Sequence, residues 1–137
     1  MRAFELDSRL AADTLSVAPL GLCQLRLMND RRWPWLILVP QRVEITEFHD
    51  LRPLDQAMLT FELGLVSKAF KQMVRADKIN IGMIGNRVSM FHCHVVARMT
   101  DDPNWPDPVW GHGAREPYGA EEGEALVRRV ADAVLSS

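Results

Sequence analysis

Two histidines stand two residues apart in an otherwise apolar run, and they are the side chains best suited to chemistry. The run is Met90-Phe91-His92-Cys93-His94-Val95-Val96-Ala97-Arg98. If it forms a strand, His92 and His94 project from the same face, about 7 Å apart along the chain. The opposite face is wholly apolar, so we expect that face to pack against the core.

Three interpretations of the paired imidazoles compete on the residues alone. The first is a pair of half-exposed structural histidines. The second is a metal site, but a third ligand is needed and only His49 and His112 remain as further histidines. The third is nucleophilic catalysis, in which one neutral imidazole attacks an electrophilic phosphorus while the other stabilises the developing charge.

Composition narrows the class of protein. The 137 residues are 47% apolar and carry a formal net charge of −2, which is typical of one domain spanning residues 1–137. The basic residues are scattered, so nucleic acid is not an expected partner. The longest apolar stretch, residues 33–40, is interrupted by Pro34 and is far shorter than the ~20 residues that span a membrane. No secretory signal follows Met1, and two cysteines form no close-spaced motif, so we predict a cytoplasmic protein.

The sequence predicts strands and helices of one core. Strands are expected where apolar residues alternate or run together between turn residues, with a turn at Gly85-Asn86 before the last strand. These strands are residues 23–27, 35–39, 79–83 and 90–98. The strand at 35–39 is apolar on both faces, as in a central strand.

Two helices complete the expected fold. Apolar residues recur at three- and four-residue steps from residue 51 to about residue 76, which predicts one long amphipathic helix. Residues 120–135 begin with acidic and end with basic side chains, as the helix dipole favours. The segment 99–119 between them is rich in proline, glycine and tryptophan, which is typical of a functional or interface loop. This order predicts an α+β domain built on an antiparallel sheet.

The histidine run resembles the signature of a known family. Residues 85–98 are similar to the pattern Gly-Gln-x-Val-x-His-φ-His-φ-His-φ-φ, with φ apolar, of the histidine triad (HIT) superfamily of nucleotide hydrolases and transferases. Residues 48–53, Phe-His-Asp-Leu-Arg-Pro, are similar to a segment of the fragile-histidine-triad branch. Residues 102–111 look like a loop of a bacterial subgroup of small HIT proteins. The resemblance covers residues 20–111 and implies a HIT-like fold.

The resemblance implies a role for each matching residue. His92 takes the place of the family's nucleophile, which forms a covalent nucleotidyl-histidine at an α-phosphorus. His94 takes the third triad position, whose imidazole contacts the phosphoryl oxygens. Asn86 stands where the family usually has a Gln that contacts the phosphate or the leaving group, and Asn29 matches a residue that binds the ribose hydroxyls. Trp35 is expected to line the pocket for the nucleotide base, although this expectation rests on no family motif.

Met90 departs from the family pattern, because it replaces the first triad histidine. A thioether cannot donate a hydrogen bond or take up a proton. The resemblance therefore implies either a hydrolase or nucleotidyl transferase for a purine nucleotide or nucleotide conjugate, or a catalytically weakened module that binds nucleotide. It further implies a homodimer and no metal or other cofactor. His49 is expected only to pack or cap, and Ser89 to lie at a bulge or at the edge of the core.

Overall fold

The computed structural model of the chain describes residues 2–137. Within them, five strands form one antiparallel sheet in the order β1-β2-β3-β5-β4. The elements run as α1 (Ser8–Asp13), β1 (Thr14–Pro19), β2 (Cys23–Met28), β3 (Trp35–Pro40), the 3-10 turn η1 (Phe48–Asp50), α2 (Pro53–Val74), β4 (Lys78–Gly82), β5 (Cys93–Arg98) and α3 (Ala120–Leu135).

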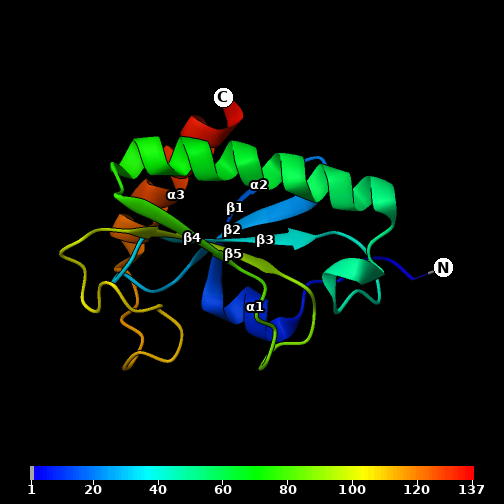
Figure 1. Cartoon of the computed structure of the whole chain (residues 1–137), viewed down its shortest axis with the longest axis horizontal. Helices are drawn as coiled ribbons and strands as arrows, with labels where there is room; N and C mark the ends of the chain where they lie inside the picture. The colour runs from blue at the N-terminus through cyan, green and yellow to red at the C-terminus, as the bar shows by residue number, and fades with distance from the viewer. Residues whose placement is uncertain (1) are drawn as a thin grey trace.

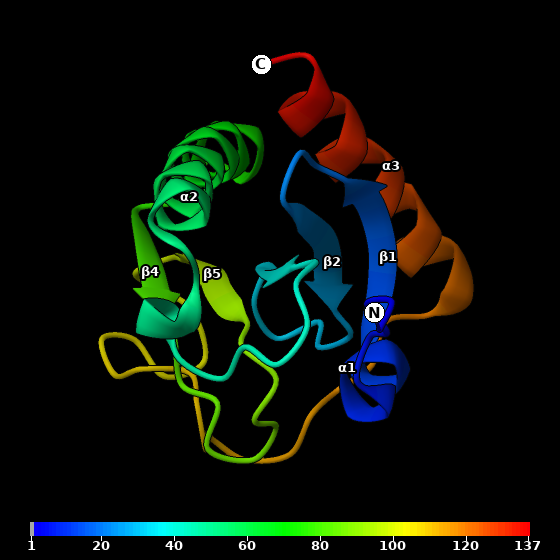
Figure 2. The ribbon, with the colours of Figure 1, turned by 90° about the vertical axis from the view of Figure 1, so that its right-hand side faces the viewer.

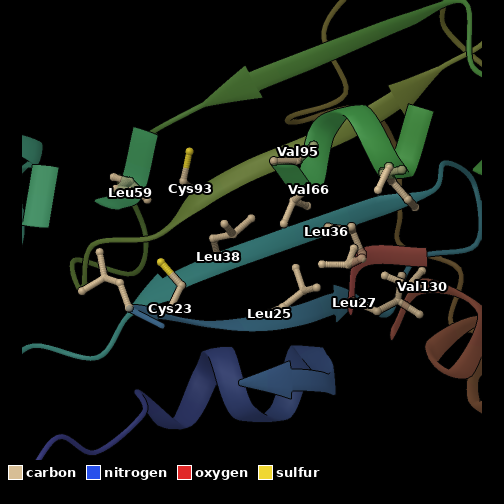
Figure 3. Close-up of a cluster of buried hydrophobic side chains, with 14 of the residues drawn as sticks. Cys23, Leu25, Leu27, Leu36, Leu38, Leu59, Val66, Cys93, Val95 and Val130 are labelled. Carbon is tan, nitrogen blue, oxygen red and sulfur yellow. The ribbon is translucent and has the colours of Figure 1, made fainter. Parts of the chain in front are cut away.

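The sheet has two differently covered faces. The long helix α2 and the C-terminal helix α3 lie on one face, and α1 with the longer connections lies on the other (Figures 1 and 2). The main core fills the space under the two long helices. Figure 3 shows Leu25, Leu38 and Val95 of the strands in one buried cluster with Val66 of α2 and Val130 of α3. The predicted α+β fold is confirmed.

The periodic elements match the predictions closely. β2 alternates buried and half-buried side chains, and all six residues of β3 are buried. α2 begins with Pro53, whose missing N–H costs no hydrogen bond in the first turn, and ends at Arg75 in the left-handed region (φ 57°). The Ala120–Leu135 helix has the predicted bounds. Because β3 is sandwiched between β2 and β5, it holds the centre of the sheet.

The prediction of a strand over residues 90–98 was wrong at its beginning, because β5 starts only at Cys93. Its partner β4 ends at Gly82, which pairs with His94, and the backbone N–H of Phe91 donates to Ile45 in the connection after β3. Residues 90–92 therefore pair with no neighbouring strand. Ten residues link β4 to β5, so Gly85-Asn86 turns within a loop and does not form a tight hairpin. β4 ends one residue before the predicted Met83.

Two elements at the start of the chain were not predicted. α1 has six residues, and its N-terminus is capped by the Asp7 carboxylate, which accepts from the N–H of Arg9. β1 carries a register shift between Ser16 and Ala18, which breaks the alternation of side chains that a regular strand shows. β1 pairs with β2 and completes its hydrogen-bonded edge, and α1 packs against β1.

Candidate functional site

The two imidazoles meet where β5 begins, on the sheet face opposite α2 and α3. His94 pairs with Ile37 of β3 on one side and Gly82 of β4 on the other. His92 precedes β5 by one residue. The rings lie 4.8 Å apart between centroids, with an interplanar angle of 66°. The predicted spacing of about 7 Å is the rise along the chain between two residues of a strand, so the two rings lie closer together than that rise.

His92 is held by the backbone of Met90. Its Nδ1 lies 2.7 Å from the Met90 carbonyl oxygen. A carbonyl oxygen only accepts, so Nδ1 of His92 carries the proton and donates it. In the neutral ring Nε2 then has a free electron pair. His92 is 6% exposed and lines a hollow in the surface, so the neutral form of this ring has its free nitrogen at the hollow.

His94 is enclosed by aromatic rings. The indole Nε1 of Trp35 donates to its Nδ1 at 3.0 Å, and Trp110 lies edge-on at 5.4 Å between centroids. Burial, together with the nearby His92, lowers the pKa of His94 to about 3. His94 is therefore neutral at physiological pH, and its proton is on Nε2 because Nδ1 is accepting.

The hollow beside His92 has a volume of about 230 Å³. One wall is formed by residues 46–49 around η1, and the other by residues 83–86 of the β4–β5 loop. Asn86 is on the second wall, where Gly85 turns the chain in the left-handed region at φ 64°. Ser89 and Phe91 lie with His92 between these walls. The structure thus brings Asn86 and His92 to one cavity.

His49 lies differently from the prediction that it packs or caps. Its side chain is 81% exposed, it lines the hollow, and its Nε2 lies 3.9 Å from Asp50. The helix-capping contacts come from Asp50, whose carboxylate accepts from the N–H groups of Thr46 and Glu47. A second imidazole is therefore present on the wall facing Asn86. Its segment resembles a family motif, but no spacing in the sequence relates it to His92.

Four predicted site residues are not among those that line this hollow, namely His94, described above, and Asn29, Trp35 and Met90. The side-chain oxygen of Asn29 accepts from the N–H of Tyr118 at 2.9 Å, which ties β2 to the segment before α3. Trp35 is 7% exposed and contacts His94. The sulfur of Met90 accepts from the N–H of Asp7, and its side chain lines a separate hollow beside the N-terminal segment. The contact of Met90 with an imidazole is made by its backbone carbonyl, which lies beside Nδ1 of His92.

Trp110 is a site residue that sequence reasoning did not assign. It reaches across β4 to His94 because Gly82 leaves room, since a Cβ at position 82 would lie 2.9 Å from Cη2 of Trp110. The loop that carries it is tied to β5 by Arg98, which is buried and binds both carboxylate oxygens of Asp102. The high tryptophan content of residues 99–119 is the signal that pointed to this loop.

Neither cysteine offers a second nucleophile. Cys23 and Cys93 are buried, and burial raises the pKa of the Cys93 thiol to about 12 and that of Cys23 further. Both thiols are therefore protonated at neutral pH.

Across residues 2–137, no three His, Cys, Asp or Glu side chains are grouped so that they could hold a metal ion. In the same residues, no helix has both the length and the apolar character needed to cross a bilayer.

The free energy of unfolding should depend on pH through the protonation of His94. In the unfolded chain its pKa is near 6.5, whereas in the fold burial lowers it to about 3. Between these pH values the unfolded state binds a proton that the folded state does not, so the free energy of unfolding falls as pH falls. The slope from this group is at most about 1.4 kcal/mol per pH unit. Urea unfolding at pH 7 and pH 5 measures it, and His94→Gln should lose less stability over that interval. Equal losses in both proteins would contradict the assignment.

The comparison with known proteins decides the family. The sequence model of the HIT domain matches residues 10–101. The chain belongs to the HIT family. A histidine triad (HIT) protein from Sinorhizobium meliloti 1021 is 56% identical, with a TM-score of 0.92 over 94% of this chain and 96% of that one. Among curated proteins, none matches the chain.

Two further HIT structures superpose over nearly the whole chain. A histidine triad protein from Bradyrhizobium japonicum is 37% identical, with a TM-score of 0.94, covering 97% of this chain and 99% of that one. One from Marinobacter aquaeolei VT8 is 36% identical, with a TM-score of 0.95, covering 98% of each. HIT family membership supports a nucleotide-binding function of the HIT type.

Proposed function

We propose that this HIT protein is a nucleotide hydrolase or nucleotidyl transferase that acts at an α-phosphorus through a covalent nucleotidyl-histidine at His92. The observation that carries the proposal is the contact between Nδ1 of His92 and the Met90 carbonyl, which leaves Nε2 unprotonated beside the hollow. A neutral imidazole with a free electron pair is a nucleophile for phosphorus. The preferred ligand is a purine nucleotide or nucleotide conjugate, bound by the whole chain as a single HIT domain.

The proposed reaction has two displacements at phosphorus. In the first, Nε2 of His92 forms a bond to the α-phosphorus, and the bond to the leaving group breaks with its electron pair. In the second, a water oxygen attacks the same phosphorus, the phosphorus–nitrogen bond breaks, and Nε2 regains its electron pair. The attacking water gives up one proton, which the departed leaving group or the solvent takes up. Nδ1 keeps its proton throughout, and the Met90 carbonyl stabilises the positive charge of the substituted ring.

The other site residues are assigned to binding and charge stabilisation. Nε2–H of His94 and the side-chain amide of Asn86 would donate to the phosphoryl oxygens, as the developing charge requires. Asn29 is proposed to contact the ribose through its free amide group, since its oxygen is engaged by Tyr118. Trp35 would border the base pocket, and Met90 serves through its carbonyl.

Because Met90 replaces the first triad histidine, a measurement of turnover decides between an enzyme and a binding module. Wild type and Met90→His are each assayed with an adenosine 5′-phosphoramidate and with a dinucleoside polyphosphate. Because the backbone carbonyl that orients His92 is present with either side chain, we expect turnover in wild type and faster turnover in Met90→His. Tight nucleotide binding without turnover in wild type, and turnover only in Met90→His, would support the alternative of a catalytically weakened binding module.

We further propose that the protein is a homodimer joined at the edge strand β4. Three apolar side chains at this edge are more than 40% exposed, namely Ile81, Met83 and Ile84. Burying such residues together with the open strand edge would favour pairing with a second copy. Met83 and Ile84 also line the hollow, so a partner there would lie beside the site.

Placing a charged side chain at the centre of the proposed interface tests the dimer. Ile81→Glu should convert a dimer to a monomer in sedimentation velocity, because a carboxylate at a closed apolar interface is left without a partner. Leu135→Glu is the matched control, since Leu135 is 63% exposed at the end of α3. A wild type that sediments as a monomer, or an Ile81→Glu dimer, would refute this interface.

A further inference from the structure

Trp35 and His94 face each other across neighbouring strands in the interior. Trp35 begins β3 and pairs with Val96 of β5, so its side chain and that of His94 lie on the same face of the sheet, two residues apart in register. Both side chains are buried. The indole Nε1 of Trp35 lies 3.0 Å from Nδ1 of His94. The hydrogen bond therefore joins two buried side chains.

The direction of this hydrogen bond is fixed by chemistry. An indole nitrogen donates and cannot accept, so Nδ1 of His94 must present its electron pair. The single proton of the neutral ring is then on Nε2. Desolvation strengthens the preference, because a buried indole N–H left without an acceptor costs more than one in water. The buried Nε1 atoms of Trp33 and Trp110 find no acceptor within residues 2–137, so of these three neighbouring indoles only that of Trp35 donates a hydrogen bond.

The two imidazoles are therefore held in opposite tautomers. His92 carries its proton on Nδ1 because it donates to the Met90 carbonyl, whereas His94 carries its proton on Nε2 because it accepts from Trp35. The rings are 4.8 Å apart between centroids. One ring thus offers an electron pair at Nε2 and its neighbour offers a donor at Nε2. This is the combination that attack on phosphorus, with charge building on the phosphoryl oxygens, requires.

We propose that Trp35 is a positioning residue that sets the tautomer of His94 and so makes its Nε2–H available to the phosphoryl oxygens. The effect of this tautomer on catalysis rests on the proposed function, whereas the hydrogen bond between Trp35 and His94 does not. It differs from a role for Trp35 as a wall of the base pocket, because it assigns the indole N–H and not the ring surface. Burial that keeps His94 neutral supports it, since only a neutral ring has a tautomer to set.

Nitrogen-15 NMR of the histidine side chains tests the proposal without any substrate. In long-range proton–nitrogen spectra of the wild type, we expect a proton on Nε2 of His94 and a proton on Nδ1 of His92. In Trp35→Phe, His94 should become a mixture of both tautomers, because its Nδ1 has lost its donor. A wild-type His94 with its proton on Nδ1 overturns the proposal by itself, even if Trp35→Phe fails to fold.

Trp33→Phe is the matched control. It removes a neighbouring indole of the same size whose ring is 6.2 Å from Trp35 between centroids and whose Nε1 has no partner within residues 2–137. Its His94 should keep the wild-type tautomer. If Trp35→Phe also keeps that tautomer and loses only stability, Trp35 has a packing role and the proposal is wrong.

Turnover gives a second readout where the protein is active. Trp35→Phe should lower kcat about tenfold, the equivalent of one lost hydrogen bond in the transition state, and leave KM unchanged. A base-wall role would instead raise KM. Because the tautomer is measured without substrate, a protein that proves inactive would refute the proposed function and still leave the assignment of Trp35 tested.

Discussion

Replacing His92 by Ala or Asn is expected to lower turnover by at least about 10⁴-fold, because no other group in the described site offers an unprotonated nucleophilic nitrogen held in place. The Met90 carbonyl fixes the ring of His92, and the hollow gives a ligand access to it. Asn retains a polar side chain of similar volume at a position that is 6% exposed, so folding should be preserved. Steady-state hydrolysis of an adenosine 5′-phosphoramidate measures the effect.

His112→Ala is the matched control for this variant. It removes another imidazole from an exposed position, beside Trp33 and outside the hollow. Its activity should stay within about twofold of wild type, as for a surface change remote from the site. If His92→Asn folds as wild type does and keeps more than a tenth of the activity, His92 is not the nucleophile.

Arg98→Met is expected to cost about 3–5 kcal/mol of stability, the largest effect of any single ion-pair change in the described residues. The Arg98 and Asp102 side chains are 1% and 5% exposed and are joined at 2.7 and 3.0 Å. Removing the guanidinium leaves the Asp102 carboxylate buried without its cation. Asn80, which accepts from Arg98 at 3.0 Å, also loses a partner. Urea unfolding at pH 7 gives the free energy of unfolding for both proteins.

Two comparisons test the cause of this loss. Arg2→Met removes an ion pair whose side chains are 70% and 72% exposed, and it should cost well under 1 kcal/mol. The double variant Arg98→Met, Asp102→Asn should be more stable than Arg98→Met alone, because it leaves no unpaired charge. A loss in Arg98→Met as small as that in Arg2→Met would show that the pair does not secure the Trp110 loop.

The parts of the fold that the sequence predicted are those with a regular side-chain period. β2 and β3 follow from alternation and from a run apolar on both faces, and α2 and α3 follow from three- and four-residue spacing. These patterns reflect burial on one or both faces, so they can be recognised without knowing what covers them. β1 was missed because its bulge at Val17 interrupts the period. α1 was missed because six residues show too little of a period.

The site was predictable in its residues but not in its contacts. The spacing of His92 and His94 and the family resemblance indicated a pair of imidazoles beside Asn86. The contacts that define their protons come from the Met90 carbonyl and from Trp35, which is 59 residues away from His94 in the sequence. Backbone carbonyls leave no trace in the sequence, and a long-range indole donor is indistinguishable from a core residue until β3 and β5 are paired.

The replacement of the first triad histidine can be understood from the same contacts. The sulfur of Met90 accepts from the N–H of Asp7, and Met90 lines the hollow beside the N-terminal segment. Its backbone carbonyl orients His92 whatever the side chain is. The proposed nucleophile therefore survives the change, while a proton donor at position 90 is lost. The rate gained in Met90→His would measure what such a donor contributes.

The most direct test of the central claim is to trap the covalent intermediate. Wild type is incubated with a labelled adenine nucleotide substrate, quenched, digested, and analysed by peptide mass spectrometry under conditions that preserve phosphoramidate bonds. We predict one adenylyl group on His92 and none in His92→Asn. Turnover of the same substrate without any adduct, or an adduct on another residue such as His49, would contradict this account.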